Sequence, residues 1–251
     1  RSSDLRVTSM FDFMNPDGTV ILNGDDDKLR GYTSKRGIQP VYFGLDPTCP
    51  FHAEQIQKMG LKGTVATFVT PSSSFSAHVS IPGDHMISNA LAGVAVGYAL
   101  GMKDEEIIRG IEKLVPIAGR NNLIEAEHYT IIDDCYNANP ASMKSSLDVL
   151  AFADTRTVAI LGDMGELGAD EKKMHAEVIC IGTLSSEMAN AARTVSEAAS
   201  DSDTKTLVYH FDTKEAFYRQ MDQLLKEQDT VLVKASHFME FPEIVKRLQV
   251  Q

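Results

Sequence analysis

The alternation of apolar and polar positions divides the chain into two parts that meet near residue 123. In the first part, short apolar runs rich in β-formers are separated by turn signals such as NPDG, which predicts strands joined by turns. The strands expected there cover 19–23, 40–45, 63–69 and 75–81. A helical period then predicts two helices, 85–101 and 104–115.

The second part has a more regular pattern, in which apolar strands alternate with helical segments. The expected strands cover 129–134, 157–163, 179–182, 206–211 and 230–236, and the expected helices lie near 141–151, 170–178, 184–198, 213–226 and 241–248. This alternation predicts an α/β fold with a mostly parallel, doubly wound sheet. Because ligands bind at the carboxyl ends of such strands, we expect DDCYNANPAS, GDMGELG and KASHFM to share one functional edge.

One junction departs from this pattern. The predicted helix runs into the next strand at Val178–Ile179 without turn residues, whereas helix-to-strand connections usually take about two to six residues. The loop-length argument therefore predicts that residues are missing from the sequence at this point.

Composition narrows the class of protein. The 251 residues are 43% hydrophobic, and a net charge of −11 argues against a surface that binds nucleic-acid phosphates. The three separated cysteines argue against a disulfide framework and a structural zinc site. Since no apolar run approaches the roughly 18 residues of a membrane span, we expect a cytoplasmic protein.

The stretch DDCYNANPAS, residues 133–142, concentrates polar chemistry at a strand end. Asn139 can cap a helix that begins with Pro140, and the N–H groups of such a helix start favour an anionic ligand. Asp133 and Asp134 are acceptors suited to ribose hydroxyls or a metal-bound water. An ordinary strand-to-helix turn with polar caps explains the spacing as well, so both interpretations stay open.

Further candidates lie outside this stretch. His85 and Asn89 fall four apart on one face of a predicted helix, where an adenine edge or the backbone could satisfy the Asn89 amide. Arg120 either forms an ion pair at the surface or binds a phosphate group. Three acidic residues, 25–27, follow a predicted strand. They form either a solvated turn or a metal site. Two histidines without ligand spacing are interpreted as structural or exposed: His175 and His237.

No phosphate-binding loop of the GxxxxGK[ST] or GxGxxG kind occurs in the sequence. Six segments nevertheless resemble the Mur ligases in order and spacing: NGDD, GDHMISNALAG, AGR, IIDDCYNANPASM, ILGDMGELG and DTVLVKAS. They are most similar to the members that join D-alanyl-D-alanine to UDP-N-acetylmuramoyl-tripeptide. The resemblance covers almost the whole chain, and its most specific part is YNANP followed by Ser142.

The resemblance implies that residues 1–122 are the second half of a central ATPase domain and that 123–251 are a C-terminal Rossmann-like domain. It implies an ATP-dependent amide ligase that is cytoplasmic and monomeric and uses Mg²⁺. Most of the magnesium ligands and the phosphate-binding loop would then lie outside this sequence. Residues 1–251 on their own would then be inactive. Two alternatives stay open, a non-catalytic nucleotide- or dipeptide-binding module and a ligase like folylpolyglutamate synthase.

The resemblance also implies roles for single residues. Catalytic roles fall on Arg120, Asn137 and Asn139. ATP-binding roles fall on His85, Asn89, Arg120, Asp134 and Tyr136, with Asn89 at the adenine, Arg120 at the phosphates and Asp134 at the ribose. Substrate roles fall on Tyr136, Ser142 and Ser236, and no residue is assigned to a metal. The chain departs from the family's usual residues at Met86, His237 and Phe238.

Overall fold

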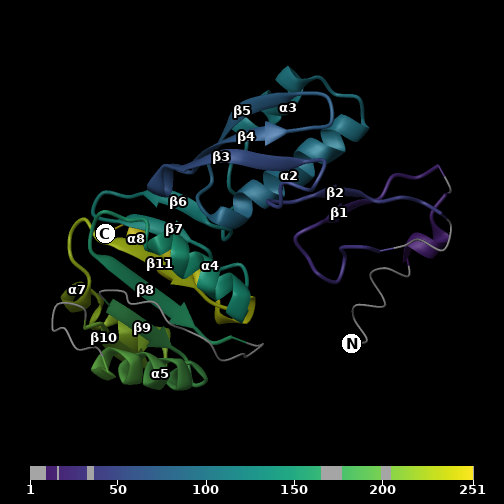
Figure 1. Ribbon diagram of the computed structural model, residues 1–251. Coiled ribbons are helices and arrows are strands. Elements are labelled where there is room, and N and C mark those ends of the chain that lie inside the picture. Colours follow the sequence, from purple (N-terminus) through teal and green to yellow (C-terminus); the bar gives the residue numbers. More distant parts are fainter. Residues whose placement is uncertain (1–9, 16, 33–36, 165–176, 199–204, 251) are drawn as a thin grey trace. The chain divides into compact units, whose positions relative to one another are not determined.

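The computed structural model describes residues 10–15, 17–32, 37–164, 177–198 and 205–250. The chain divides into two compact units, Arg1–Leu114 and Val115–Gln251 (Figure 1). This division by contacts lies close to the predicted boundary at 122, while the assignment of the two parts to family domains stays a prediction. No helix in the described part of the chain is long and apolar enough to cross a membrane.

The first unit packs two helices against a small antiparallel sheet. The sheet has the order β3-β4-β5, and the shorter strands β1 and β2 pair in parallel beside it. Its strands and helices are β1 (Ile21–Asn23), β2 (Val41–Phe43), β3 (His52–Lys58), β4 (Thr64–Val69), β5 (Ser74–Val79), α2 (Asp84–Ala99) and α3 (Asp104–Glu112), with 3-10 turns at Met10–Phe13 and Gly60–Lys62. Phe68, Leu91 and Ile107 belong to the core that joins sheet and helices.

The second unit is built on a six-stranded sheet of order β10-β9-β8-β11-β7-β6, in which only β6 runs antiparallel. The strands are β6 (Asn122–Glu125), β7 (Thr130–Asp133), β8 (Thr157–Gly162), β9 (Glu177–Ile181), β10 (Leu207–Phe211) and β11 (Thr230–Lys234). The helices are α4 (Pro140–Leu150), α5 (Ser185–Ala198), α6 (Lys214–Tyr218), α7 (Met221–Leu224) and α8 (Pro242–Gln249), with a 3-10 turn at His237–Met239.

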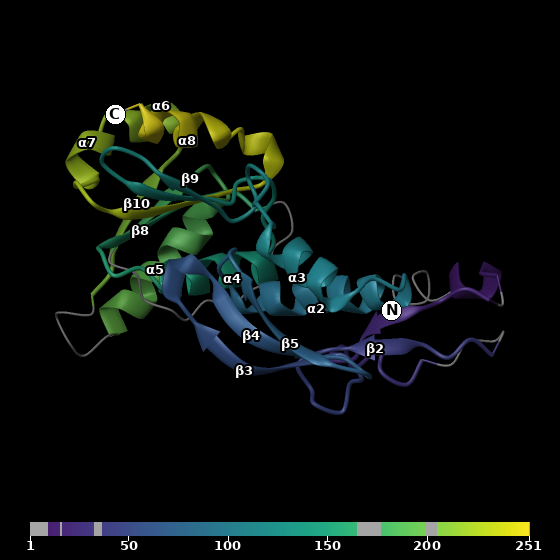
Figure 2. The same cartoon turned by 90° about the horizontal axis from the view of Figure 1, so that it is seen from above.

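Helices cover both faces of this sheet, with α4 and α5 on one side and α6, α7 and α8 on the other (Figure 2). Every residue of β9 and β11 is buried, as expected for central parallel strands covered on two sides. Ile160, Val233 and Phe241 lie in the core shared with α6 to α8. The prediction of a mostly parallel, doubly wound α/β sheet is confirmed.

The structure differs locally from the predicted strands and helices. Strand β3 was not predicted because HAEQIQK is polar and mostly exposed, and β6 was not predicted because NLIE is only four residues long. The helix expected at 213–226 is two short helices, α6 and α7, whose buried side chains still pack on one core.

The junction Val178–Ile179 is an ordinary step inside β9, and both residues pair with neighbouring strands. The predicted helix therefore does not extend to Val178, and the prediction that residues are missing between this helix and the strand stays a prediction. The rest of the predicted helix, 170–176, lies outside the described residues.

A buried ion cluster holds the amino ends of three parallel strands together. Arg156 forms ion pairs with Glu177 at 2.8 Å and with Asp229 at 2.5 Å, and its NH2 group also donates to the Leu224 carbonyl. Asp229 is 1% exposed and Glu177 is 5% exposed, so both carboxylates depend on this guanidinium for compensation. The cluster fixes the edge of the sheet that lies opposite the predicted functional edge.

We predict that Arg156→Met lowers the free energy of unfolding by about 3 kcal/mol, because it leaves two buried carboxylates without their cation. Urea denaturation of the purified protein measures the loss. Arg219→Met, at an exposed position after α6, is the matched control and should cost less than about 0.5 kcal/mol. Equal losses in the two variants would contradict the assignment.

Candidate functional site

The carboxyl ends of β7, β8 and β11 meet at one edge of the second unit's sheet. Val233 of β11 is in register with Asp133 of β7, and Lys234 is in register with Leu161 of β8. The residues that follow these strands therefore share one edge, as predicted. Of the segment GDMGELG, the part 165–168 lies outside the described residues.

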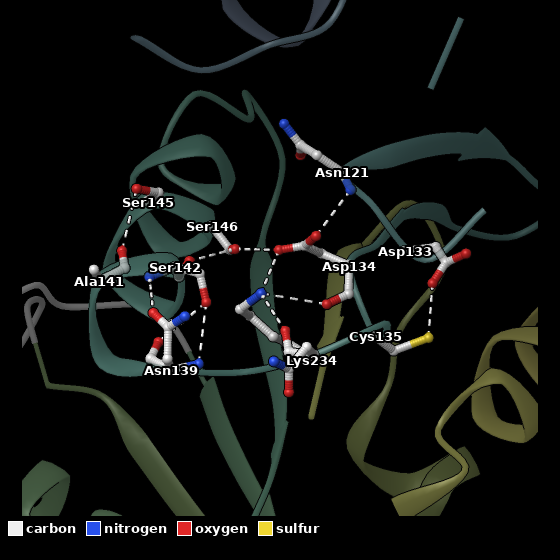
Figure 3. Close-up of polar contacts among 11 residues, drawn as sticks. Asn121, Asp133, Asp134, Cys135, Asn139, Ala141, Ser142, Ser145, Ser146 and Lys234 are labelled. Atoms are coloured by element: carbon white, nitrogen blue, oxygen red, sulfur yellow. Dashed lines mark hydrogen bonds and ion pairs between the residues drawn. The ribbon is translucent and has the colours of Figure 1, made fainter. Parts of the chain in front are cut away.

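Asp134 lies at the centre of a hydrogen-bond network at this edge (Figure 3). Its Oδ1 accepts from the backbone N–H of Asn121 at 2.9 Å. Its Oδ2 accepts from the Ser146 hydroxyl and from the Lys234 ammonium, both at 2.5 Å. The carboxylate thus joins the segment before β6, helix α4 and strand β11 through charge-assisted bonds, which are the stronger class.

The start of α4 is capped as the sequence predicts. Asn139 accepts from the Ser142 N–H through its side chain at 2.8 Å, and its own N–H donates to the Ser142 hydroxyl at 3.1 Å. Pro140 occupies the first helical turn. The Asn139 amide oxygen and the Ser142 hydroxyl are therefore engaged in the cap. This supports the interpretation as a capped turn for these two side chains, which position the helix start.

Asp133 anchors the segment that carries Arg120. Its Oδ2 accepts from the Gly119 N–H at 2.8 Å, and its Oδ1 accepts from the Cys135 thiol at 2.8 Å. The Tyr136 N–H donates back to the Gly119 carbonyl at 2.9 Å. Because Asn121 is bound to Asp134, Arg120 is flanked on both sides by residues tied to the end of β7.

Arg120 and Tyr136 form an exposed cation–aromatic pair. The Arg120 guanidinium lies 4.3 Å from the centre of the Tyr136 ring, and the His237 ring lies 5.7 Å from the same ring. Tyr136 is 51% exposed. The stacking holds the guanidinium at the surface beside the strand-end turn. His237 is exposed, as predicted, and His175 lies outside the described residues.

Cys135 is a buried thiol whose pKa is raised, first by burial and then by the neighbouring Asp133 carboxylate. The thiol therefore stays protonated at neutral pH and donates to Asp133. Nucleophilic chemistry needs the thiolate, so Cys135 is a structural donor and does not act as a nucleophile.

The neighbouring strand end is shaped by Asp163. Its Oδ1 accepts from the Ser185 N–H at 2.6 Å at the start of α5, and its carbonyl accepts from the Ser236 N–H at 3.2 Å. Ser236, a predicted substrate residue, is 5% exposed. Asn137, by contrast, is exposed beside Tyr136 in the same turn.

In the first unit, His85 and Asn89 are both exposed on α2. The Asn89 amide donates to the Met86 sulfur at 3.5 Å, and because the residue is exposed, solvent can satisfy the amide without a ligand or a backbone partner. The acidic turn is structural at Asp25, whose carboxylate accepts from the backbone N–H groups of Leu45 and Asp46. In the described ranges, no three His, Cys, Asp or Glu side chains gather as metal ligands.

The sequence interpretation missed three residues of the network: Asn121, Ser146 and Lys234. Ser146 lies one helical turn after Ser142, and its hydroxyl lies within hydrogen-bond distance of both Asp134 and the Ser142 carbonyl, so its one proton is shared between the two acceptors. Lys234 carried a usable signal, since a lysine inside the apolar run TVLVKAS is rarely buried without an acidic partner. The partner itself could be found only from the strand order.

We predict that Gly119→Ala is more destabilising than Gly101→Ala. Both glycines have positive φ angles, +77° and +74°, which cost an alanine about 1–2 kcal/mol. A Cβ at Gly119 would also lie 3.2 Å from Tyr136, whereas nothing lies within 4 Å of one at Gly101. Chemical denaturation measures the two losses, and equal values would contradict a tight contact at Gly119.

Known protein families match both parts of the chain. Residues 7–97 match the Mur ligase middle domain, and residues 119–237 match the Mur ligase glutamate ligase domain. The chain is 32% identical over 252 aligned residues to the UDP-N-acetylmuramoyl-tripeptide–D-alanyl-D-alanine ligase of Escherichia coli, covering 96% of this chain and 54% of that protein. The enzyme of the same name from Treponema pallidum is 36% identical over 63% of this chain and 36% of its own length.

Solved structures show the same fold. A crystal structure of MurF from Acinetobacter baumannii superposes with a TM-score of 0.79 at 24% identity, covering 97% of this chain and 55% of that one. MurF from Thermotoga maritima in complex with ADP gives a TM-score of 0.74 at 20% identity, over 97% and 56% of the two chains. The chain thus spans about half the length of these relatives.

Proposed function

Since this chain belongs to the Mur ligase family, we propose that it is part of an ATP-dependent ligase that adds D-alanyl-D-alanine to UDP-N-acetylmuramoyl-tripeptide. The relatives of this name support the two substrates, and the ADP complex of the Thermotoga relative supports nucleotide binding. We propose that the enzyme acts in the cytoplasm and that its two family domains divide near residue 122.

The observation that carries the proposal is the incomplete coordination of Asp134. A carboxylate offers about four acceptor positions. Oδ2 uses two for Ser146 and Lys234, and Oδ1 uses one for Asn121. Among the residues that the structure describes, one acceptor position on Oδ1 therefore remains, which suits a single ribose hydroxyl.

Arg120 is the residue proposed for the ATP phosphates. Its guanidinium is exposed, stacked on Tyr136 and flanked by residues bound to Asp133 and Asp134. A planar cation held in this way can offer two parallel N–H bonds to a phosphate. Tyr136 supports the guanidinium from one face, and we keep it among the nucleotide- and substrate-binding residues.

The turn after Asp134 is proposed for the incoming dipeptide. Asn137 is exposed and remains a catalytic candidate, while Asn139 and Ser142 act through the helix start that they cap. The positive end of the α4 helix dipole favours a carboxylate there. Ser236, His85 and Asn89 stay proposals, as does a role for Mg²⁺, whose ligands we expect mostly outside this sequence.

In the proposed reaction, the terminal carboxylate of the tripeptide attacks the γ-phosphorus of ATP and releases ADP. The amine of D-alanyl-D-alanine then attacks the acyl phosphate carbonyl, an amide bond forms, and inorganic phosphate leaves. Magnesium and cationic side chains neutralise the charge of the transferred phosphoryl group in such chemistry. Positioning of the reactants supplies the rest of the catalytic effect.

Asp134→Asn tests the nucleotide assignment. If Asp134 accepts from one ribose hydroxyl, only the analogue that lacks this hydroxyl, 2′-deoxy-ATP or 3′-deoxy-ATP, loses the contact. In the wild-type complete gene product, the KM for that analogue should be about tenfold above the KM for ATP. Asp134→Asn should raise the KM for ATP and erase this discrimination, and Asn89→Ala should raise the KM without erasing it. Unchanged KM and turnover in both variants would contradict the assignment.

The reaction itself is tested by substrate-dependent release of phosphate. The complete gene product should hydrolyse ATP only when both the UDP-linked tripeptide and D-alanyl-D-alanine are present, with one amide formed per ADP. L-Glutamate in place of the dipeptide should give at least a hundredfold less product, because a site built for one acceptor leaves polar groups unpaired with another. Preference for glutamate would favour the folylpolyglutamate-synthase-like alternative, and binding without turnover would favour a binding module.

A further inference from the structure

Lys234 is a buried cation at the end of the central strand β11. The residue is 1% exposed and lies between the ends of β7 and β8 in the sheet. A lysine is almost never fully buried unless it is paired, because its charge loses its hydration. Its partners therefore indicate what it does.

All three ammonium donors of Lys234 have acceptors within the chain. Its Nζ donates to the Asp134 carboxylate at 2.5 Å, the Asp134 carbonyl at 3.4 Å and the Asn137 carbonyl at 3.1 Å (Figure 3). An ammonium group has three N–H donors and no acceptor. Lys234 therefore has no donor left for a phosphate or a substrate, and a direct catalytic contact is excluded in this arrangement.

The three acceptors belong to the two ends of one turn, residues 134–137. At one end Lys234 compensates the charge of Asp134, and at the other it holds the backbone of Asn137. The turn carries Tyr136, whose ring supports Arg120. A single buried cation thus connects the groups proposed for the ribose, the phosphates and the dipeptide.

We infer that Lys234 is a positioning residue that holds the turn 134–137 in its binding conformation and orients the Asp134 carboxylate through its ion pair. The inference rests on the proposed function, since the turn matters for catalysis only if it binds nucleotide. Lys234 acts through Asp134 and Asn137 and touches no substrate.

Replacing Lys234 by an apolar residue, with Asp134 unchanged, would disrupt this network. Without the ammonium, the Asp134 carboxylate, whose side chain is 16% exposed, would keep only neutral donors, and the Asn137 carbonyl would lose its Lys234 bond. Breaking one partner out of a buried pair is far more disruptive than replacing both. Loss of a purely structural pair would only lower stability. Loss of a positioning pair would also change nucleotide affinity in the folded protein.

The test compares Lys234→Met with Lys144→Met in the complete gene product. Lys144 forms an exposed ion pair with Asp148 at 2.9 Å on α4 and provides the matched control. With the folded fraction checked by circular dichroism, Lys234→Met should raise the KM for ATP roughly 10- to 100-fold while kcat changes less than about threefold. Lys144→Met should leave both constants unchanged. A folded Lys234→Met protein with the wild-type KM would overturn the inference.

A second measurement covers the case in which Lys234→Met does not fold. The double variant Lys234→Met/Asp134→Asn removes both charges and should recover the fold but keep the raised KM. Hydrogen exchange on this double variant should be at least about tenfold faster than wild type at the amides of 135–139, which the turn holds, and unchanged in β8. Wild-type exchange rates at these amides would overturn the inference.

The outcomes separate this inference from the proposed function. If Lys234→Met or the double variant loosens 135–139 but Asp134→Asn leaves the KM for ATP unchanged, Lys234 positions the turn and the nucleotide assignment fails. If Asp134→Asn raises the KM and the Lys234 variants change neither KM nor exchange, the nucleotide assignment stands and the positioning role fails.

Discussion

The ion pair between Lys234 and Asp134 is the interaction on which the functional edge depends. It exists because β11 lies beside β7 in the sheet, which brings together two residues that are 100 positions apart in the chain. Both charges lie largely out of water, so the pair is stable only with the added donors from Asn121 and Ser146. The same bonds hold the turn that carries Tyr136.

The two ends of the parallel sheet are thus fixed by charge, and the middle is held by apolar packing. At the amino ends, Arg156 compensates Glu177 and Asp229. At the carboxyl ends, Lys234 compensates the charge of Asp134. The amino-end cluster is built for stability, whereas the carboxyl-end pair leaves groups at the surface that can bind a ligand. This asymmetry agrees with ligand binding at the carboxyl ends of parallel strands.

The sequence predicted the helices and strands with a strong apolar period, and it predicted that the carboxyl ends of β7, β8 and β11 meet at one edge of the sheet. The cap formed by Asn139 and Pro140 was also readable, because capping depends on neighbouring residues alone. Strands β3 and β6 were missed because their stability comes from pairing with β4 and β7, which local composition does not record. For the same reason the partners of Asp134 were not predicted, since Lys234 and Asn121 reach it only through the strand order.

We propose that the carboxyl-end network around Asp134 receives an adenine nucleotide. Titration of Mg-ADP into the ¹⁵N-labelled complete gene product, followed by NMR, tests this proposal. We expect the backbone amides of Asn121, Asp134 and Tyr136 to shift together with one dissociation constant, while those next to Arg156 at the opposite edge stay in place. Nucleotide binding that leaves these three amides unchanged would contradict the proposal.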